Sequence, residues 1–440
     1  MKRSLLPWLC FALALLVAPL VFPQSAALSL LSQMGTMVLL CLSYNMLLGE
    51  GGMLSFGHAV YSGLGAFGAI HLMNGIADGS APLPFSFPIT LVPLAGGLVG
   101  ALCGVVFGFL TTRRAGTTFS MITLGLVELV SACVLMFPDL FGGEGGISAN
   151  RVVGEPVLGI SYGPQIQVYY LIAVWLLACT AAIYALRHTP LGRILNAVRD
   201  NPERAAFIGY DPQRVRYLAL ILSAFFAGVS GGLSAINFEI VSAEYVGSLR
   251  SGAILLFTFI GGAAYFYGPI IGGVVGVLFA SLLSAYTQAW QFYLGAFFIL
   301  IVMCVPGGLA RLIDNLARVL RAGALNTRLA RLLAAQAAAG LVALAGVVLA
   351  TEMAYQLSLG SLADSGAGVA PAVLFGIAFD VHSPLTWSAA AALAAAGIAA
   401  IVRLRPSWSS SWSLAWKKME AAEHVRREAA SSCRIDREAP

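Results

Sequence analysis

Charged residues are scarce in this sequence. Asp, Glu, Lys and Arg make up 10% of its 440 residues, whereas a soluble domain averages about 25%. Hydrophobic residues make up 59%, and the mean hydropathy is +0.86. A water-soluble fold of this size would need more charge to cover its surface, so the apolar excess must face lipid. The composition excludes an ordinary soluble enzyme and predicts an all-α, polytopic integral membrane protein that sits in a lipid bilayer.

Lysine is rarer still. Lys2, Lys417 and Lys418 are the three lysines of the sequence, so its body contains no phosphate-binding loop of the Gly-x-x-x-x-Gly-Lys-[Ser/Thr] type. The net charge of +5 rests mainly on arginines, which stand in short runs between apolar segments. A nucleic-acid-binding protein would instead gather basic and aromatic residues on one solvated face. Nucleic acid is therefore not an expected partner.

Paired cysteines and paired metal ligands are also missing. The seven cysteines include no Cys-x-x-Cys spacing, and the five histidines include no His-x-x-x-His or His-Glu-x-x-His spacing. Most of the cysteines lie in apolar stretches, where buried and unreactive thiols are the rule. No nucleophile with a base and no metal-ligand cluster is recognisable. We expect no cofactor, no metal site and no enzymatic activity in this chain.

Long apolar segments fill most of the sequence. Because about 20 apolar residues of helix cross a bilayer, we expect about ten core transmembrane helices. They lie near 5–22, 28–48, 53–73, 89–110, 117–137, 166–186, 217–236, 252–267, 269–287 and 291–305. Ala-rich segments near 332–351 and 386–402 add up to two more. The Gly-rich stretches around Gly63 and Gly262 fit either simple spans or re-entrant and broken helices.

The distribution of arginine predicts the orientation, because short cytoplasmic loops are enriched in Lys and Arg. With a cytoplasmic N-terminus, the arginine-rich segments 187–216 and 311–331 fall inside, whereas the loops 74–88 and 138–165 share one arginine. A cleaved secretory signal is the other interpretation of the N-terminus. Its apolar run of about 18 residues is longer than the usual signal core, and its removal would invert this agreement. We expect a multi-pass protein with an uncleaved first helix.

The largest polar feature is the loop 189–216. Gly192 opens it, an amphipathic stretch follows, Pro202 restarts a helix, and Gly209 can end that helix. The pattern predicts two short helices joined by a tight turn on the cytoplasmic face. Small residues flanked by arginines are suited to docking into a groove on another protein. The alternative is a solvated basic loop that only sets orientation.

This loop also carries a family resemblance. Gly192-Arg193 and the run from Arg199 to Gly209 resemble the coupling loop of permeases in the branched-chain amino acid ABC importer family. Further similar motifs follow that family's order: Asn45–Gly49 and Gly52–Ala59, Thr123–Glu128, Ser223–Leu233, and Pro306–Leu309. The long first half and the arginine-rich loop are more similar to the M-type subunit than to its counterpart. The resemblance covers residues 25–315.

The resemblance implies partners and a set of coupling residues. It implies ATP-binding cassette subunits that hydrolyse ATP, a second permease subunit, and a periplasmic or extracellular solute-binding protein. It implies import of branched-chain or related small amino acids across the bacterial inner membrane. The residues that would contact the ATPase are Arg193, Arg199, Asp200, Pro202, Glu203, Ala205, Ala206 and Gly209.

The resemblance also implies a division of the chain. Residues 1–315 form the permease transmembrane domain, with the coupling loop at 189–216. Residues 316–440 form a C-terminal extension with one or two Ala-rich apolar segments and a polar tail. Trp408, Trp412 and Trp416 of the tail fall on one helix face, which is typical of an interfacial helix.

Glu128 is the ionisable residue that stands out within an apolar segment. A carboxylate at that depth is costly and is usually functional or paired. It either lines the translocation pathway or locks two helices together. The small polar residues Ser55, His58 and Ser62 either line the same pathway or serve helix packing. A rival hypothesis makes the chain a secondary transporter or channel, coupled to ions or protons through Glu128.

Overall fold

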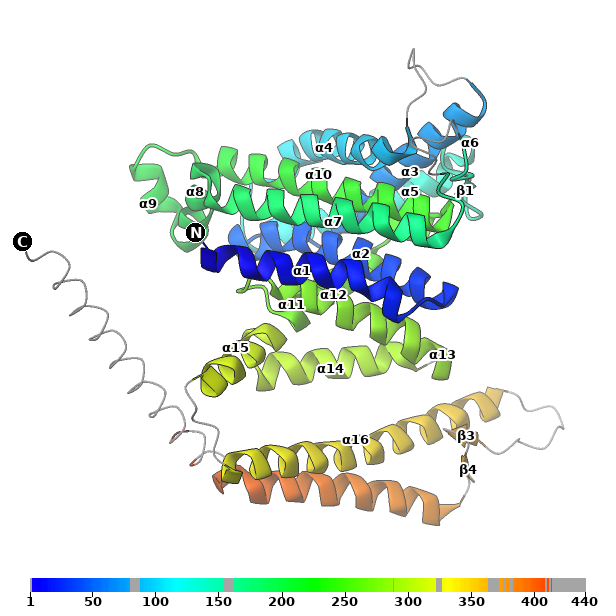
Figure 1. Cartoon of the computed structure of the whole chain (residues 1–440), viewed down its shortest axis with the longest axis vertical. Helices are drawn as coiled ribbons and strands as arrows, with labels where there is room; N and C mark the ends of the chain where they lie inside the picture. The colour runs from blue at the N-terminus through cyan, green and yellow to red at the C-terminus, as the bar shows by residue number, and fades with distance from the viewer. Residues whose placement is uncertain are drawn as a thin grey trace, which may run out of the picture. The chain divides into compact units, whose positions relative to one another are not determined.

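The computed structural model describes residues 2–79, 88–153, 161–287, 289–321, 327–362, 372–374, 377–379 and 383–407, with 410 and 413. Most of them are helical (Figure 1). The chain divides into two compact units, Met1–Leu312 and Ile313–Pro440. The expected tail tryptophans, Trp408, Trp412 and Trp416, lie outside the described residues.

The first unit contains most of the helices. They are α1 Lys2–Val21, α2 Ser25–Asn45 with a π-helical end at Met46–Glu50, α3 His58–Ala77, α4 Val92–Thr111, α5 Thr117–Met136, α6 Pro138–Phe141, α7 Gln165–His188, α8 Pro190–Asp200, α9 Pro202–Phe207, α10 Pro212–Phe238, α11 Ser248–Gly261, α12 Gly268–Leu278, α13 Ser284–Tyr286 and α14 Trp290–Cys304. The helix α15, Gly308–Arg321, contains the boundary between the units. Two short strands, β1 Ile147–Ser148 and β2 Ile240–Val241, pair antiparallel.

The helices α8 and α9 lie at one end of this unit, and β1 lies at the other (Figure 1). We call these the loop end and the strand end. The start of α1 also lies at the loop end, where the Trp8 and Tyr184 rings meet edge to face at 5.4 Å. At the strand end, Asn74 donates a hydrogen bond to the Ser148 carbonyl at 3.1 Å. The long helices of the unit therefore run between the loop end and the strand end.

Small residues bring α4 and α10 into close contact. Gly96, Gly100, Gly104 and Gly108 recur every fourth residue of α4 and form one face that packs against α10. A Cβ atom at Gly100 would overlap the Ala224 carbonyl oxygen of α10, so only glycine fits there. Without a hydrophobic driving force in lipid, such close backbone approach is what holds membrane helices together. The α10 helix thus packs closely against both α4 and α3.

The expected span 53–73 begins later than the sequence indicated. After the π-helical end of α2, residues 51–57 are not helical, and α3 begins at His58. Gly52 has a φ of +64°, which an L side chain rarely adopts. The stretch is held by side chains of α5: the Phe56 N–H donates to Thr123 Oγ1 at 3.0 Å, and Ser120 Oγ donates to the Leu54 carbonyl. Ser55 therefore lies outside any helix.

The expected span 252–267 is shorter and lies earlier, as α11, whereas the expected span 269–287 is continuously helical from α12 through a π-helical stretch, Phe279–Leu283, to α13; α11 and α12 pack against each other. Gly262, with a φ of +108°, ends α11. Cβ atoms at Gly261 and Gly272 would overlap backbone carbonyls of the opposite helix. The stretch around Gly262 is therefore a break, as one of the two sequence interpretations allowed. The other stretch, around Gly63, is continuous helix in α3.

The second unit contains α16, Thr327–Leu362, a helix at Pro384–Ser407, and the strand pair β3 Ala372–Leu374 and β4 Ile377–Phe379. The two helices meet through glycine and alanine. A Cβ atom at Gly346 would lie 2.8 Å from the Ala390 carbonyl oxygen, and one at Gly397 would lie 2.6 Å from Ala343. Both helices are long and apolar enough to cross a bilayer.

Candidate coupling site

The loop 189–216 contains the two short helices that its sequence predicts. Thr189 caps α8 by accepting a hydrogen bond from the Gly192 N–H, and Asn201 caps α9 by accepting one from the Arg204 N–H at 2.9 Å. Such caps satisfy backbone donors that a helix start leaves free. Gly209, with a φ of +96°, follows the end of α9. The two helices and their tight turn are therefore a built element at the loop end.

The predicted coupling residues fall into two groups in this element. Ala205 is 4% exposed and packs into the interior of the unit, together with Leu195 and Val198 of α8. The other seven, Arg193, Arg199, Asp200, Pro202, Glu203, Ala206 and Gly209, are exposed. Ala205 thus seats α9 against its own chain, whereas the exposed residues are available to a partner.

Two apolar side chains at the end of α9 were missed by sequence reasoning. Phe207 is 89% exposed and Ile208 is 71% exposed. They project from an element rich in charged residues rather than from an apolar span. Their position in the run Ala205–Gly209 is the signal that could have identified them. Together with Ala206 they form an exposed apolar tip, which we call the α9 tip.

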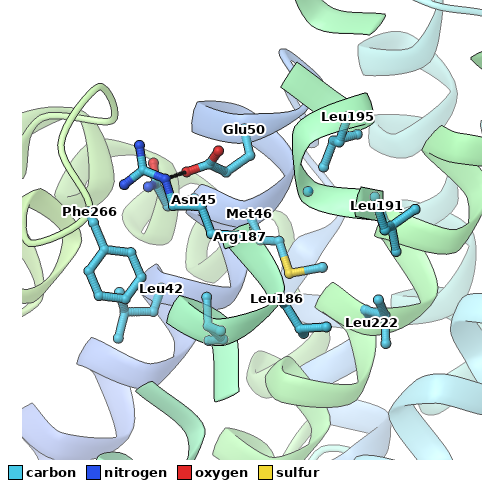
Figure 2. Close-up of a pocket in the computed structure, with 13 residues that line it drawn as sticks. Leu42, Asn45, Met46, Glu50, Leu186, Arg187, Leu191, Leu195, Leu222 and Phe266 are labelled. Carbon is cyan, nitrogen blue, oxygen red and sulfur yellow. Dashed lines mark ion pairs between the residues drawn. The ribbon is translucent and has the colours of Figure 1, made fainter. Parts of the chain in front are cut away.

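Glu50, at the end of α2, joins this element to the transmembrane helices. Its Oε1 atom lies 2.9 Å from Arg187 Nε at the end of α7, and its Oε2 atom accepts a hydrogen bond from Asn196 Nδ2 of α8 at 2.6 Å. Figure 2 shows the ion pair between Glu50 and Arg187. The Glu50 side chain is 14% exposed and the Arg187 side chain is 37% exposed, so the carboxylate is the more buried member of a partly exposed pair, and salt screens a partly buried pair less than one at a free surface. One carboxylate thus links α2, α7 and α8.

Arg199 of α8 forms a second link to the same place. Its guanidinium donates to the Gly49 carbonyl, and its Nε lies 3.0 Å from Asp200. A Cβ atom at Gly52 would lie 2.7 Å from Arg199 Cγ, so the start of the non-helical stretch 51–57 lies directly against α8. We call the contacts of Glu50, Arg187, Asn196 and Arg199 the Glu50 clamp.

An apolar pocket lies beside the Glu50 clamp. Its walls come from α2, α7, α8 and α10, with Phe266 from the turn between α11 and α12. Figure 2 shows that Leu42, Met46, Leu186 and Leu191 line it below the ion pair. The loop-end element therefore lies over an apolar pocket and is fixed by polar contacts at its edge.

The predicted pathway residues Ser55, His58 and Ser62 are all buried in the unit. Ser43 Oγ donates to the Leu40 carbonyl at 2.7 Å, so it accepts from His58 Nε2 at 2.9 Å. His58 Nδ1 is then the acceptor nitrogen, and among the described residues it has no partner. Ser62 donates to the Ala59 carbonyl at 3.1 Å. In this conformation these side chains pack between helices.

The structure does not place Glu128 beside the other predicted pathway residues. The buried face of α5 consists of Phe119, Ser120, Thr123, Val127, Val130 and Val134. Glu128 lies beside this face and is exposed, as are Leu124 and Leu129. Among the described residues no hydrogen bond or ion pair is recorded for it. The described residues thus show no contact through which Glu128 holds two helices of this chain together.

The described residues define a class of protein. Seven of their helices are long and apolar enough to cross a membrane, or eight if the bent pair Trp290–Cys304 and Gly308–Leu320 counts as one span. No group of three or more His, Cys, Asp or Glu residues suited to a metal ion occurs within the described ranges. The protein is an all-α, multi-pass membrane protein with two short helices, α8 and α9, at its loop end.

The comparison with known sequences names the family. The family described as "Branched-chain amino acid transport system / permease component" matches residues 26–305. The chain belongs to this family, which confirms the resemblance seen in the motifs. The chain is 27% identical over 326 residues to the high-affinity branched-chain amino acid transport system permease protein LivM of Salmonella typhimurium, covering 68% of this chain and 74% of that protein.

Two further relatives mark the range of the family. LivM of Escherichia coli strain K12 is 27% identical over 293 residues, which cover 62% of this chain and 67% of that protein. The fructose import permease protein FrcC of Rhizobium meliloti is 27% identical over 252 residues, which cover 54% of this chain and 68% of that protein. The LivM relatives confirm the similarity to the M-type subunit. No solved structure matches the chain.

Proposed function

We propose that this chain is the permease subunit of an ATP-driven importer, which moves branched-chain or related small amino acids inward across the bacterial inner membrane. The family membership and the LivM relatives support the role and the substrate class. ATP hydrolysis falls to separate ATP-binding cassette subunits, because no lysine lies between Lys2 and Lys417 to build a phosphate-binding loop.

The observation that carries this proposal is the combination of the α9 tip with the Glu50 clamp. The tip offers Phe207 and Ile208 to a groove on a partner. The clamp ties the same element to α2 and α7. When ATP closes the ATPase pair, the tip moves with its partner, and the clamp passes that motion to the helices. The ATPases supply the free energy, and the permease alternates between two shapes.

The remaining parts of the machine follow from the same assignment. The loop end is cytoplasmic, as is the N-terminus, because the arginine-rich loop 187–216 lies there. A solute-binding protein delivers substrate at the strand end, and a second, non-identical permease completes the pathway, to whose lining this chain contributes Ser55, His58, Ser62 and Glu128. FrcC is named for fructose import, so membership of the family alone does not fix the solute.

We assign the permease role to residues 1–315 and treat residues 316–440 as an extension. The family match, which ends at residue 305, supports this division. The helices of the extension pack against each other through Gly346 and Gly397. The extension has no part in the coupling mechanism proposed above.

Replacing Phe207 with Asp is expected to remove the ATPase subunits from the purified complex. Burying a phenylalanine side chain contributes about 1.5–3 kcal/mol, so its loss weakens docking by about 10–100-fold. The measurement is the amount of ATPase subunit that co-purifies with the tagged permease in mild detergent.

Val152→Asp is the matched control, since Val152 is 51% exposed in the strand-end loop. It should retain the ATPase. Equal recovery of ATPase with Phe207→Asp and with the unaltered protein would show that the α9 tip is not the docking surface.

A further inference from the structure

The chain after α10 turns back into the layer of helices through the short strand β2 and a single 3-10 turn, Ala243–Val246, without an α-helix. At the strand end, β2 pairs with β1, and the Ser148 carbonyl of β1 accepts from Asn74, near the end of α3. A few residues later, the Tyr245 carbonyl lies against Gly63, where a Cβ atom would be 2.7 Å away. Asn74 is eleven residues from Gly63, so the chain has moved about 16 Å along α3 towards the loop end.

The helix α11 therefore starts inside the helix layer. Ser251 Oγ in its first turn accepts from the Ala59 N–H at 3.1 Å, at the start of α3. Its other end, at Gly262, lies against Gly307 near the loop end. A helix of 14 residues is about 21 Å long, shorter than the roughly 30 Å hydrocarbon core. Non-helical backbone at such depth is tolerated only where protein buries it or where it lines a watery cavity.

Arg250 lies in the first turn of this short helix. Its guanidinium carbon is 4.1 Å from the centre of the Tyr245 ring. The guanidinium also donates a hydrogen bond to the Tyr245 side chain, whereas its Nε atom is buried and has no hydrogen-bond partner among the described residues. None of the ion pairs within the described ranges includes it. An arginine held at this depth without an acid is a binding group by default.

The surroundings of Arg250 favour an anionic ligand. The start of α11 directs free backbone N–H groups and the positive end of the helix dipole to the same place. The planar guanidinium can bind a carboxylate through two parallel hydrogen bonds. The neighbouring Ser248 and Leu249 are exposed and Arg250 is half-buried, so the site lies close to the surface of this chain. The position combines a cation with a helix start.

We propose that Arg250 binds the carboxylate of the transported amino acid during its passage through the permease. This inference rests on the proposed function, since it takes an amino acid as the solute. Tyr245 holds the guanidinium against its ring, and α11 contributes its N-terminal backbone. The arginine then contributes to selectivity for a carboxylate within the membrane, in addition to selection by the binding protein.

The test uses the complete importer in proteoliposomes, with radiolabelled leucine as the probe. Arg250→Gln should lower ATP-dependent uptake at least tenfold while the complex still hydrolyses ATP, so that more ATP is used per leucine. Arg250→Lys should keep more uptake than Arg250→Gln. The matched control is Arg113→Gln, because Arg113 also lies over a ring, that of Phe109, at 4.3 Å. Its uptake should stay within twofold.

Two results would overturn the inference. Uptake by Arg250→Gln within twofold of the unaltered importer would show that the arginine does not act on the solute. Loss of the second permease from the purified Arg250→Gln complex would show that Arg250 is an assembly contact instead. The proposed function fails separately, if the unaltered complex shows no ATP-dependent uptake at all.

A second measurement does not depend on transport. Arg250→Cys, in a background with the seven native cysteines replaced, should react with a membrane-impermeant methanethiosulfonate reagent, and millimolar leucine should slow that reaction. A thiol at position 250 that is unreactive from water would place the residue against lipid or protein, and would contradict the proposal.

Discussion

Glu50→Gln is expected to uncouple ATP hydrolysis from import. The substitution keeps the shape of the side chain but removes the negative charge of the Glu50 carboxylate, which pairs with Arg187 and accepts a hydrogen bond from Asn196. A hydrogen bond to a charged group contributes about 1.5–3 kcal/mol, and a coupling free energy of about 1–3 kcal/mol corresponds to about 5–150-fold. We expect leucine uptake to fall about tenfold or more, with the ATPase subunits still bound and active. The measurement is leucine imported per ATP hydrolysed in proteoliposomes.

The control for this prediction is an ion pair at the same end of the unit that is exposed. Arg214 lies 3.2 Å from Asp211, and its side chain is 86% exposed. Exposed pairs contribute about 0–1 kcal/mol, so Arg214→Gln should leave coupling unchanged. Arg187→Gln should match Glu50→Gln, and the double variant should be little worse than either. Additive losses would show that the two residues do not act through one contact.

Gly231→Ala is expected to destabilise the transmembrane unit more than any surface substitution. A Cβ atom at Gly231 would overlap the Ser62 carbonyl oxygen and would lie 2.9 Å from the Ala66 nitrogen. These are backbone atoms of α3, so no side chain can move aside. Overpacking of this kind costs about 1–3 kcal/mol. The measurement is the thermal unfolding midpoint of the purified permease, which should fall by several degrees.

Gly125 provides the opposite case in the same unit. It lies in α5, and a Cβ atom there would meet no atom within 4 Å. Because alanine favours helix over glycine by about 0.8–1 kcal/mol, Gly125→Ala should keep or raise the midpoint. A Gly231→Ala protein as stable as the unaltered one would contradict the close packing of α10 on α3.

The sequence predicts the long helices and the loop-end element well, because both depend on local patterns. Long apolar runs identify helices such as α4 and α7. Pro202 and Gly209 mark the start and end of α9. These signals act within a few residues and do not depend on which helices become neighbours.

The features that the sequence does not reveal depend on contacts between distant segments. Glu50 and Arg187 stand at the ends of separate apolar runs, and only the packing of α2 beside α7 brings them together. Glu128 lies in a helix that is apolar all round, so no periodicity shows which face meets protein. The sequence leaves open whether the Gly-rich stretches around Gly63 and Gly262 are continuous or broken, because hydropathy is averaged over a span, whereas a change of direction depends on one φ angle.

The most direct test of the account is leucine uptake by proteoliposomes that contain both permeases, with the binding protein outside and ATP inside. We predict uptake only when the ATPase subunits are present and ATP is hydrolysed, without any ion gradient. Uptake without ATPase subunits, driven by a proton or ion gradient and lost in Glu128→Gln, would contradict the account and would establish a secondary transporter instead.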